Sequence, residues 1–269
     1  MEEGPGVAKA LSGAAEGAPA VWLDARLRSL SLLHRSAVVR KLVDVGTRGV
    51  HVEPIPSWLG ESQRALLVSN YPSVYQTLRA LIKMGCRLPG DGYRLKGIGR
   101  PDVVRQANNV LKALGIDDLI FPVYKDDAGA YRLHRRVSKQ VLDYLDGQGS
   151  VLWMSVTGTT RGNGLLEGDL RTGAAVFSVS KSVPLVPMAL VTKEVQGKPK
   201  VIKVRFGEPV QPPSVAELSD LDRNDLLIDL SRLALCGVAS LLPPEQRGDF
   251  EEPEEKLEEV QARLSYLYQ

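Results

Sequence analysis

The chain has 269 residues, of which 43% are hydrophobic and 25% are charged, and its formal net charge is +2 at pH 7. This length and composition suit a soluble protein with one large α/β domain or two small ones, and they exclude the disordered and collagen-like classes. The small net charge gives no support for nucleic-acid binding, so any basic surface must come from local clustering of Lys and Arg.

Cysteine content and apolar runs indicate the compartment. Cys86 and Cys236 are far apart and lack a second pair, so we expect two reduced core residues, no zinc site and no disulfide framework. We also expect no other metal and no cofactor. No run approaches the ~18 to 20 apolar residues of a membrane span, and residues 1–20 lack the basic and apolar regions of a signal peptide. The sequence therefore predicts a cytoplasmic protein, or one that is peripheral on the cytoplasmic face of a membrane.

Residues 1–20 form a predicted flexible tail, and residues 21–60 form a predicted amphipathic helix followed by a connector. Leucines recur on one face of the helix over 21–45, and the basic residues lie largely off that face. Two interpretations stay open. Either the helix packs on a sheet with its basic face in water, or it lies on anionic lipid headgroups with its basic residues towards phosphate.

The stretch from residue 65 to 77 joins an apolar strand to a polar turn. Residues 65–69 are apolar or small without alternation, which predicts a strand covered on both faces in a parallel sheet. Pro72 disfavours helix at Tyr71 and suits the first turn of a helix, so we expect a helix from about 72 to 84. The polar turn would then lie at the carboxyl end of a parallel strand, where open α/β proteins place their sites.

The rest of the chain alternates between predicted strands and helices. Strands are expected over 93–98, 119–123, 150–155, 184–192 and 200–206, and helices over 101–114, 129–145, 171–181, 221–242 and 251–269. This succession favours an α/β fold whose mostly parallel sheet carries helices on both faces. We expect residues 61–248 to form this domain and residues 249–269 to form a charged C-terminal helix, which packs on a partner chain or faces solvent.

Two glycine-containing segments are candidates for phosphate binding. Gly97-x-Gly99 lacks the third glycine of a dinucleotide fingerprint, and residues 158–164, GTTRGNG, lack the Gly-Lys-Ser/Thr ending of a P-loop. Arg161 nevertheless follows an apolar strand, beside backbone amides freed by small residues, where it is well placed to hold a phosphate. The alternative is a surface loop whose arginine pairs with a neighbouring carboxylate.

The order of several motifs points to a family. The turn Asn70-Tyr71-Pro72-Ser73 is followed by Phe121-Pro122-Val123-Tyr124-Lys125, Thr159-Thr160-Arg161, Arg171-Thr172-Gly173-Ala174-Ala175 and Val183-Pro184-Leu185-Val186-Pro187. In this order the motifs resemble the 1-acylglycerol-3-phosphate acyltransferase family of glycerolipid synthesis, over about residues 65–245. The resemblance implies that family's fold and its lipid ligands.

The resemblance also shows which catalytic residues the chain lacks. The family carries a His-x-x-x-x-Asp motif after the asparagine, in which His is the general base for the acceptor hydroxyl and Asp orients the imidazole. The corresponding residues here are Tyr71 and Gln76. A tyrosine with a pKa near ~10 is ionised in roughly one molecule in a thousand at pH 7, and glutamine does not stabilise an imidazolium. The histidines, His34, His51 and His134, lie outside the motif.

The family's phosphate-binding block is partly kept. The family reads Phe-Pro-Glu-Gly-Thr-Arg there, and the corresponding residues 156–161 end in an arginine. The register of these residues against the family motif stays open. No Asp or Glu occurs between Gly147 and Leu166, so the family's glutamate is absent in any register. Lys125 stands where the family has another arginine, with poorer bidentate geometry. No residue is predicted to be catalytic. The residues predicted to bind phosphate or substrate are Asn70, Ser73, Lys125, Thr160 and Arg161.

Three functions follow from these patterns. Because phosphate-binding charges persist without the proton-transfer residues, the first is a pseudoenzyme that binds a phospholipid, lysophospholipid or acyl chain, or serves as a subunit of an assembly. The alternative is an active acyltransferase that moves an acyl group from acyl-CoA or acyl carrier protein to a lysophospholipid or another hydroxyl acceptor, with a distant histidine folded into the site. The third is a nucleotide- or nucleic-acid-binding α/β protein that uses the basic residues at 132–139, although nucleic acid is not the expected partner.

Overall fold

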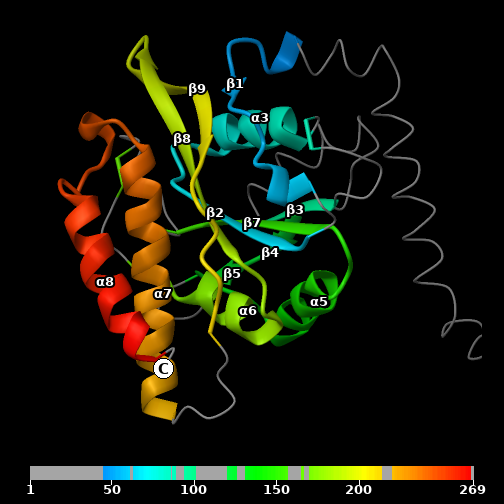
Figure 1. Ribbon diagram of the computed structural model, residues 1–269. Coiled ribbons are helices and arrows are strands. Elements are labelled where there is room, and N and C mark those ends of the chain that lie inside the picture. Colours follow the sequence, from blue (N-terminus) through cyan, green and yellow to red (C-terminus); the bar gives the residue numbers. More distant parts are fainter. Residues whose placement is uncertain are drawn as a thin grey trace, which may run out of the picture. The chain divides into compact units, whose positions relative to one another are not determined.

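A seven-stranded sheet is the centre of this protein in its computed structural model (Figure 1). The structure describes residues 45–60, 63–85, 87–88, 94–100, 120–125, 131–156, 165–166, 170–213 and 220–267. They belong to one unit, which begins at residue 44. The predicted tail, all but the last residue of the predicted helix over 21–45, and the predicted helix over 101–114 lie outside the described residues.

The sheet is mostly parallel, as predicted, with the order β1-β9-β8-β2-β7-β3-β4. Its parallel neighbours are β8 (Leu185–Val195), β2 (Ala65–Ser69), β7 (Ser150–Ser155), β3 (Arg94–Gly99) and β4 (Ile120–Pro122). β9 (Lys198–Phe206) runs antiparallel to β8, and β1 (His51–Val52) is parallel to β9. The predicted connector before residue 61 thus contains an edge strand.

Helices cover both faces of the sheet, as predicted. α3 (Val74–Gly85) lies on one face, and α5 (Arg135–Leu145), α6 (Gly173–Lys181) and α7 (Asp220–Leu241) lie on the other (Figure 1). α8 (Pro253–Leu267) packs on α7. Two short 3-10 helices, η1 (Ser57–Gly60) and η2 (Pro244–Gln246), lie in connecting segments.

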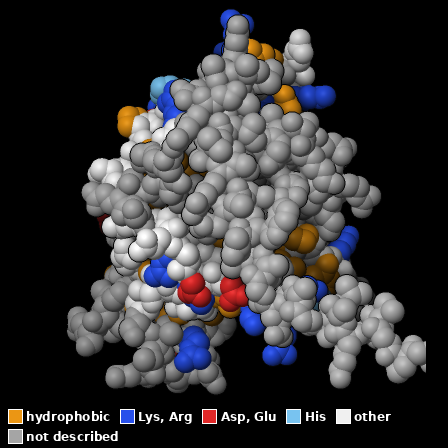
Figure 2. Space-filling view, turned by 90° about the vertical axis from the view of Figure 1, so that its right-hand side faces the viewer, with side chains coloured by type: hydrophobic (Ala, Val, Ile, Leu, Met, Phe, Trp, Pro, Cys, Tyr) orange, Lys and Arg blue, Asp and Glu red, His pale blue; other side chains and the backbone are white. Residues whose placement is uncertain are grey.

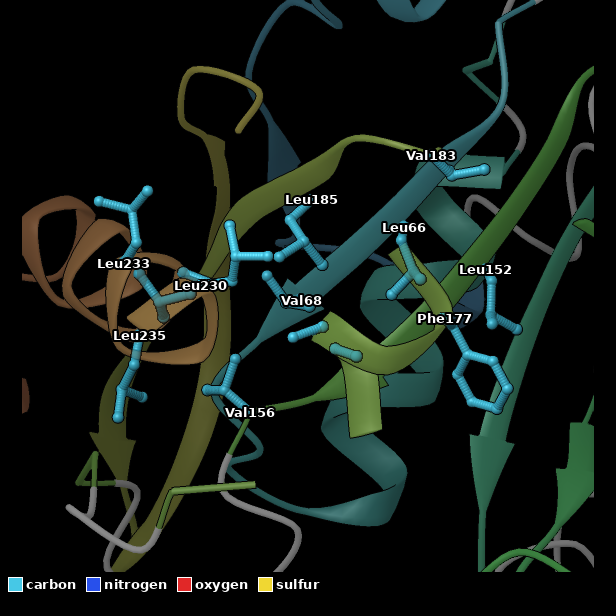
Figure 3. Close-up of a cluster of buried hydrophobic side chains, with 14 of the residues drawn as sticks. Leu66, Val68, Leu152, Val156, Phe177, Val183, Leu185, Leu230, Leu233 and Leu235 are labelled. Atoms are coloured by element: carbon cyan, nitrogen blue, oxygen red, sulfur yellow. The ribbon is translucent and has the colours of Figure 1, made fainter. Parts of the chain in front are cut away.

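Strand β2 divides its side chains between two hydrophobic cores. Leu66 and Val68 lie in the core under α6 and α7 (Figure 3). Ala65 and Leu67 lie in the core between the sheet and α3. All four are fully buried, which confirms the prediction of a strand covered on both faces. Because burying a leucine side chain contributes roughly 1.5–3 kcal/mol, this short strand helps to hold both helical layers in place.

A short hairpin replaces the start of the helix predicted over 129–145. β5 (Tyr124–Lys125) pairs antiparallel with β6 (Tyr131–Arg132), and α5 begins only after His134. The Nδ1 atom of His134 accepts a hydrogen bond, 3.3 Å long, from a backbone N–H in the first turn of α5. Pairing between the two strands uses the backbone groups that an earlier helix start would need, so the hairpin overrides the local helical pattern.

β8 and β9 form one long hairpin. Both extend beyond the strands predicted over 184–192 and 200–206, and they meet at Gln196 and Gly197, whose φ angles are 53° and 72°. Two consecutive positive φ angles are those of a type I′ turn, which matches the twist of antiparallel strands. A two-residue connection of this kind permits only antiparallel pairing, so β9 departs from the direction of the parallel strands.

The C-terminal helix α8 packs its apolar side on α7. Val260 and Leu264 are buried there, and Nη2 of Arg263 donates to Oδ1 of Asp229 at 3.0 Å. The acidic first turn of α8 is exposed. The chain itself therefore covers the apolar side of this helix, and a protein partner stays a prediction for its exposed side.

Cys236 is buried and free, as expected, and burial raises the pKa of its thiol. Cys86 lies outside the described residues. Within the described ranges, no helix combines the length and the apolar character that crossing a bilayer requires.

Candidate functional site

The carboxyl ends of β2, β7, β3 and β4 lie side by side at one edge of the sheet. Ser69 pairs with Ser155, and Gly99 pairs with Pro122. The backbone N–H of Val156 also donates to the carbonyl oxygen of Ser69 at 3.0 Å. The polar turn after β2, the loop after β7 and the segment after β4 therefore leave the sheet at the same edge, where parallel sheets carry their sites.

Asn70 uses its side chain to bind β8. Its Nδ2 atom donates to the carbonyl oxygen of Leu190 at 3.0 Å, and its Oδ1 atom accepts from the N–H of Leu190 at 2.8 Å. The residue is only 1% exposed. Because both ends of the carboxamide are paired with backbone, Asn70 continues the β2–β8 ladder one step past the backbone pair of Ser69 and Met188. The predicted contact of Asn70 with substrate stays a prediction beside this structural role.

Ser73 caps helix α3. Its Oγ atom accepts from the backbone N–H of Gln76 at 3.3 Å, and its carbonyl oxygen accepts from the N–H of Thr77 at 2.9 Å. A serine in this position satisfies backbone donors that the first helical turn leaves unpaired. The helix therefore begins at Val74 and not at Pro72. The pattern Ser-x-x-Gln at 73–76, which is a capping-box signature, is the sequence signal that locates this start.

Tyr71 is half-buried and packs on an aromatic neighbour. Its ring centroid lies 6.0 Å from that of Trp153, with the two ring planes tilted by 44°. The indole Nε1 of Trp153 donates to Oγ of Ser69 at 2.9 Å, and that Oγ donates to the carbonyl oxygen of Asn70 at 2.8 Å. The residue in the position of the family's general base thus stands on a buried, hydrogen-bonded support.

Gln76 is hydrogen-bonded to the scaffold. Its Oε1 atom accepts from Nη1 of Arg79 at 2.9 Å and from the backbone N–H of Val201, in β9, at 3.0 Å. The bond to Val201 ties α3 to β9, and the bond to Arg79 lies within α3. The carboxamide oxygen in the position of the family's orienting acid is therefore used to hold a helix against the sheet.

Arg79 is a buried cation that the sequence interpretation missed. It is 8% exposed, and its Nε and Nη2 atoms donate to the carbonyl oxygens of Gly46 and Arg48, both at 2.9 Å. Its guanidinium carbon lies 5.7 Å from the ring centroid of Tyr75. Among the described residues it pairs with neutral acceptors only, and no ion pair with a carboxylate is present. Because an arginine in a helix is most often a solvated residue, no local signal distinguishes this one.

The two described histidines lie outside the turn after β2. His51 is exposed in the edge strand β1, and His134 is exposed with its ring 6.1 Å from that of Tyr124, two residues after β4 ends. β1 and β4 are each three strands from β2 in the sheet order. Neighbouring strands are about 4.8 Å apart, so His51 is separated from β2 by roughly 14 Å of sheet. His134 lies outside this sheet, as the N-cap residue of α5. His34 lies outside the described residues.

The predicted phosphate-binding cations are only partly placed. Lys125 is exposed in β5, and Thr160 and Arg161 lie outside the described residues. The phosphate-binding roles of all three stay predictions. Within the described ranges, no group of three or more His, Cys, Asp or Glu side chains is arranged to hold a metal ion.

Basic side chains are scattered on the face shown in Figure 2. The Lys and Arg side chains of described residues appear there at separate positions and do not merge into one patch. Nucleic-acid binding usually relies on a continuous basic stripe or patch, and the nucleic-acid alternative stays a prediction.

Comparisons with known proteins include a structural likeness. No protein-family model matches the chain, and no curated protein sequence matches it. The chain is similar to the crystal structure of the 1-acyl-sn-glycerophosphate (LPA) acyltransferase PlsC from Thermotoga maritima, with a TM-score of 0.48 and 15% sequence identity, over 82% of each chain. A likeness at this identity assigns no activity to the chain.

Proposed function

We propose that this chain is an acyltransferase-like protein that has lost acyl transfer and binds a phospholipid, a lysophospholipid or an acyl chain, or serves as a subunit of an assembly. The order of its motifs along residues 65–245 supports the first part of the proposal. The residues at the turn after β2 support the second.

The observation that carries the loss of activity is the engagement of Gln76. An orienting acid has to face the base that it orients. The Oε1 atom of Gln76 instead accepts hydrogen bonds from Arg79 and from the backbone of Val201. Position 76 therefore contributes to the scaffold, and it keeps no acceptor atom for a catalytic base at position 71.

The turn after β2, residues 70–73, also contains no His, Asp or Glu. General-base catalysis needs the base within about 3 Å of the proton that it removes, or one water away. Tyr71 packs on Trp153, and His51 lies in β1, three strands away from β2. This geometry weighs against His51 as the distant histidine of an active acyltransferase.

The retained cations support binding of a phosphate-bearing lipid. Lys125 follows β4, and Arg161 follows β7 in the sequence, so both chain segments leave the sheet at the edge that carries the turn after β2. Ammonium and guanidinium groups form strong charge-assisted hydrogen bonds with phosphate oxygens. Peripheral attachment to a membrane through residues 21–45 belongs to the same proposal.

Turnover and bound lipid are tested separately. Purified protein is incubated with acyl-CoA or acyl carrier protein and lysophosphatidate, and we expect no transfer above the level of the variant Lys125→Ala/Arg161→Ala. Clear transfer above that level would refute the loss of activity.

Mass spectrometry of the natively purified protein then identifies the ligand. We expect a phospholipid, lysophospholipid or fatty acyl species to co-purify, and to be depleted in the Lys125→Ala/Arg161→Ala variant. The matched control is Arg135→Ala/Lys139→Ala on α5, where both residues are exposed. Equal lipid content in all three proteins would contradict the predicted phosphate contacts, and absence of lipid would remove the lipid-binding proposal.

A further inference from the structure

The β8–β9 hairpin extends past the end of β2. β8 has 11 residues and β2 has five, and their backbone pairing ends at Ser69 and Met188. Asn70 then binds Leu190, and the side chain of Gln246 binds both backbone groups of Thr192. Beyond this point β8 and β9 continue as a two-stranded ribbon, which rises above the rest of the sheet in Figure 1.

One face of this ribbon is basic. Lys193 is paired with Lys200, and Val195 is paired with Lys198. Directly opposed residues share a face, and so do alternate residues along a strand, so these four side chains lie on the same face. We call it the lysine face. Glu194 lies on the opposite face because it alternates with its neighbours, so the lysine face carries three positive charges and no acid.

The lysine face places like charges directly against each other. Lys193 and Lys200 are a cross-strand pair, an arrangement that destabilises an antiparallel ribbon. Within the described part of the chain, none of the three lysines forms an ion pair or a side-chain hydrogen bond. Lys203, further along β9, by contrast pairs with Glu53 at 2.5 Å. An anionic partner bound at the lysine face would offset this repulsion.

We propose that the lysine face docks on an anionic phospholipid surface. Basic segments bind anionic membrane leaflets through charge, and aliphatic side chains add to binding by entering the boundary between headgroups and acyl chains. Val195 is 42% exposed among the lysines at the end of the ribbon. An exposed valine suits a lipid surface and contributes nothing to contact with nucleic-acid phosphates.

Docking at the lysine face brings the membrane to the candidate site. The hairpin begins next to the end of β2, because Asn70 is bonded to Leu190 three residues before Lys193. The choice of a lipid surface rests on the proposed function, in which the ligand is itself a lipid. The docking surface is separate from the residues predicted to bind that ligand.

The test uses the full chain and vesicles of phosphatidylcholine with and without phosphatidylserine, at low salt. The variant Lys193→Gln/Lys198→Gln/Lys200→Gln removes the charge of the lysine face, and Arg135→Gln/Arg136→Gln/Lys139→Gln removes the same charge from exposed positions of α5. Each lysine near an anionic surface contributes about fivefold in affinity, so we expect the hairpin variant to lose roughly 100-fold and the α5 variant far less. Val195→Thr is expected to weaken binding without any change of charge.

Several outcomes would overturn the proposal. Vesicle binding that is unchanged in the hairpin variant, or equally reduced in both triple variants, removes the lysine face as the docking surface. Wild-type protein that binds duplex RNA or DNA more tightly than phosphatidylserine vesicles, with loss of that binding in the hairpin variant, assigns the face to nucleic acid. Lipid that co-purifies with the hairpin variant at the wild-type level supports the proposed function whatever the vesicles show, so the two proposals fail separately.

Discussion

The Oε1 atom of Gln76 accepts a hydrogen bond from Nη1 of Arg79, one turn further along α3, at 2.9 Å. The same oxygen accepts from the backbone N–H of Val201, and Arg79 continues the network to Gly46 and Arg48. This pair joins the helix, the neighbouring strand and the preceding segment at the position where the resembled family orients its catalytic base.

The first prediction concerns restoration of the family's dyad. In the variant Tyr71→His/Gln76→Asp, we expect the new carboxylate to pair with the buried guanidinium of Arg79 and not with the imidazole, because a cation is already within hydrogen-bond range of position 76. Acyl transfer from acyl-CoA to lysophosphatidate should therefore stay at background.

Adding Arg79→Met to that variant tests whether pairing of the new carboxylate with Arg79 is what prevents acyl transfer. If Arg79 captures the carboxylate, the triple variant is the one that can gain activity, provided that it folds by circular dichroism. Transfer by the double variant alone would show that the carboxylate reaches the imidazole after all.

The second prediction concerns the stability of the Arg79 network. Arg79→Met leaves the carbonyl oxygens of Gly46 and Arg48 and one acceptor of Gln76 without their donors, so we expect the free energy of unfolding to fall by about 2–4 kcal/mol. Urea denaturation followed by circular dichroism measures it. The control Arg87→Met removes an exposed side chain that donates to the carbonyl of Val52 at 2.7 Å, and it should cost about 1 kcal/mol. Equal losses of unfolding free energy in the two variants would mean that burial of Arg79 adds nothing to the contribution of its hydrogen bonds to stability.

The third prediction is a pH dependence at Asn70. Asn70→Asp replaces the donor to Leu190 with an oxygen and buries a carboxylate beside a carbonyl, which should cost about 2–4 kcal/mol at pH 7. Burial raises the folded-state pKa of this carboxyl above its unfolded value of about 3.9. The protonated acid can donate to the carbonyl of Leu190, so the cost is smallest near pH 4 and grows as the pH rises through the folded-state pKa.

Denaturant unfolding at several pH values checks whether the cost of Asn70→Asp grows with pH. Wild-type protein provides the reference at each pH, and Asn70→Leu, which has no titratable group, should show a cost that does not change with pH relative to it. A difference between Asn70→Asp and wild type that is constant with pH would contradict burial of the carboxylate.

The fourth prediction separates stability from function at the lysine face. Lys200→Glu turns a like-charge cross-strand pair with Lys193 into an opposite-charge pair, so we expect stability to rise by about 0.2–1 kcal/mol while vesicle binding weakens. Lys203→Glu, on the same strand, breaks the pair with Glu53 and should lower stability. Thermal unfolding compares the two variants. A lower melting temperature for Lys200→Glu would show that the two lysines do not repel each other.

The fifth prediction concerns the start of α3. Ser73→Ala removes the acceptor for the N–H of Gln76 and should cost about 1 kcal/mol, whereas Ser73→Asp keeps a capping oxygen and should cost little. Chemical denaturation of both variants against wild type measures the difference. Identical stabilities for the two would mean that the cap contributes nothing and that the start of the helix is held by packing alone.

The parts of the fold that the sequence predicts are those with a local cause. Residues 150–155 were expected to be a strand and form β7 over that range, because a buried parallel strand is an apolar run. The start of α5 was misplaced because β5 and β6 pair with each other across intervening residues, which a helical pattern does not reveal. The Ser-x-x-Gln cap at 73–76 was present in the sequence and locates the start of α3 correctly.

The candidate site is less predictable because most of its contacts join residues that are far apart in the sequence. The absence of a catalytic histidine and aspartate from positions 71 and 76 is readable from the sequence alone. The hydrogen bonding of Gln76 cannot be read from the sequence, because its partner Val201 lies 125 positions further along the chain. Asn70 and Arg79 hold the scaffold through hydrogen bonds to backbone groups. Every residue presents such groups, so the sequence does not reveal which ones these two side chains bind.

The bonds of Asn70 and Gln246 to β8 have a further consequence. Backbone groups on one edge of a strand recur every second residue, and these two carboxamides pair with Leu190 and Thr192, both N–H and C=O in each case. Each carboxamide thus takes the place of a neighbouring strand after β2 has ended. An uncovered edge invites pairing with another chain and aggregation, so these two side chains protect the edge of β8 between the end of β2 and the start of the projecting hairpin.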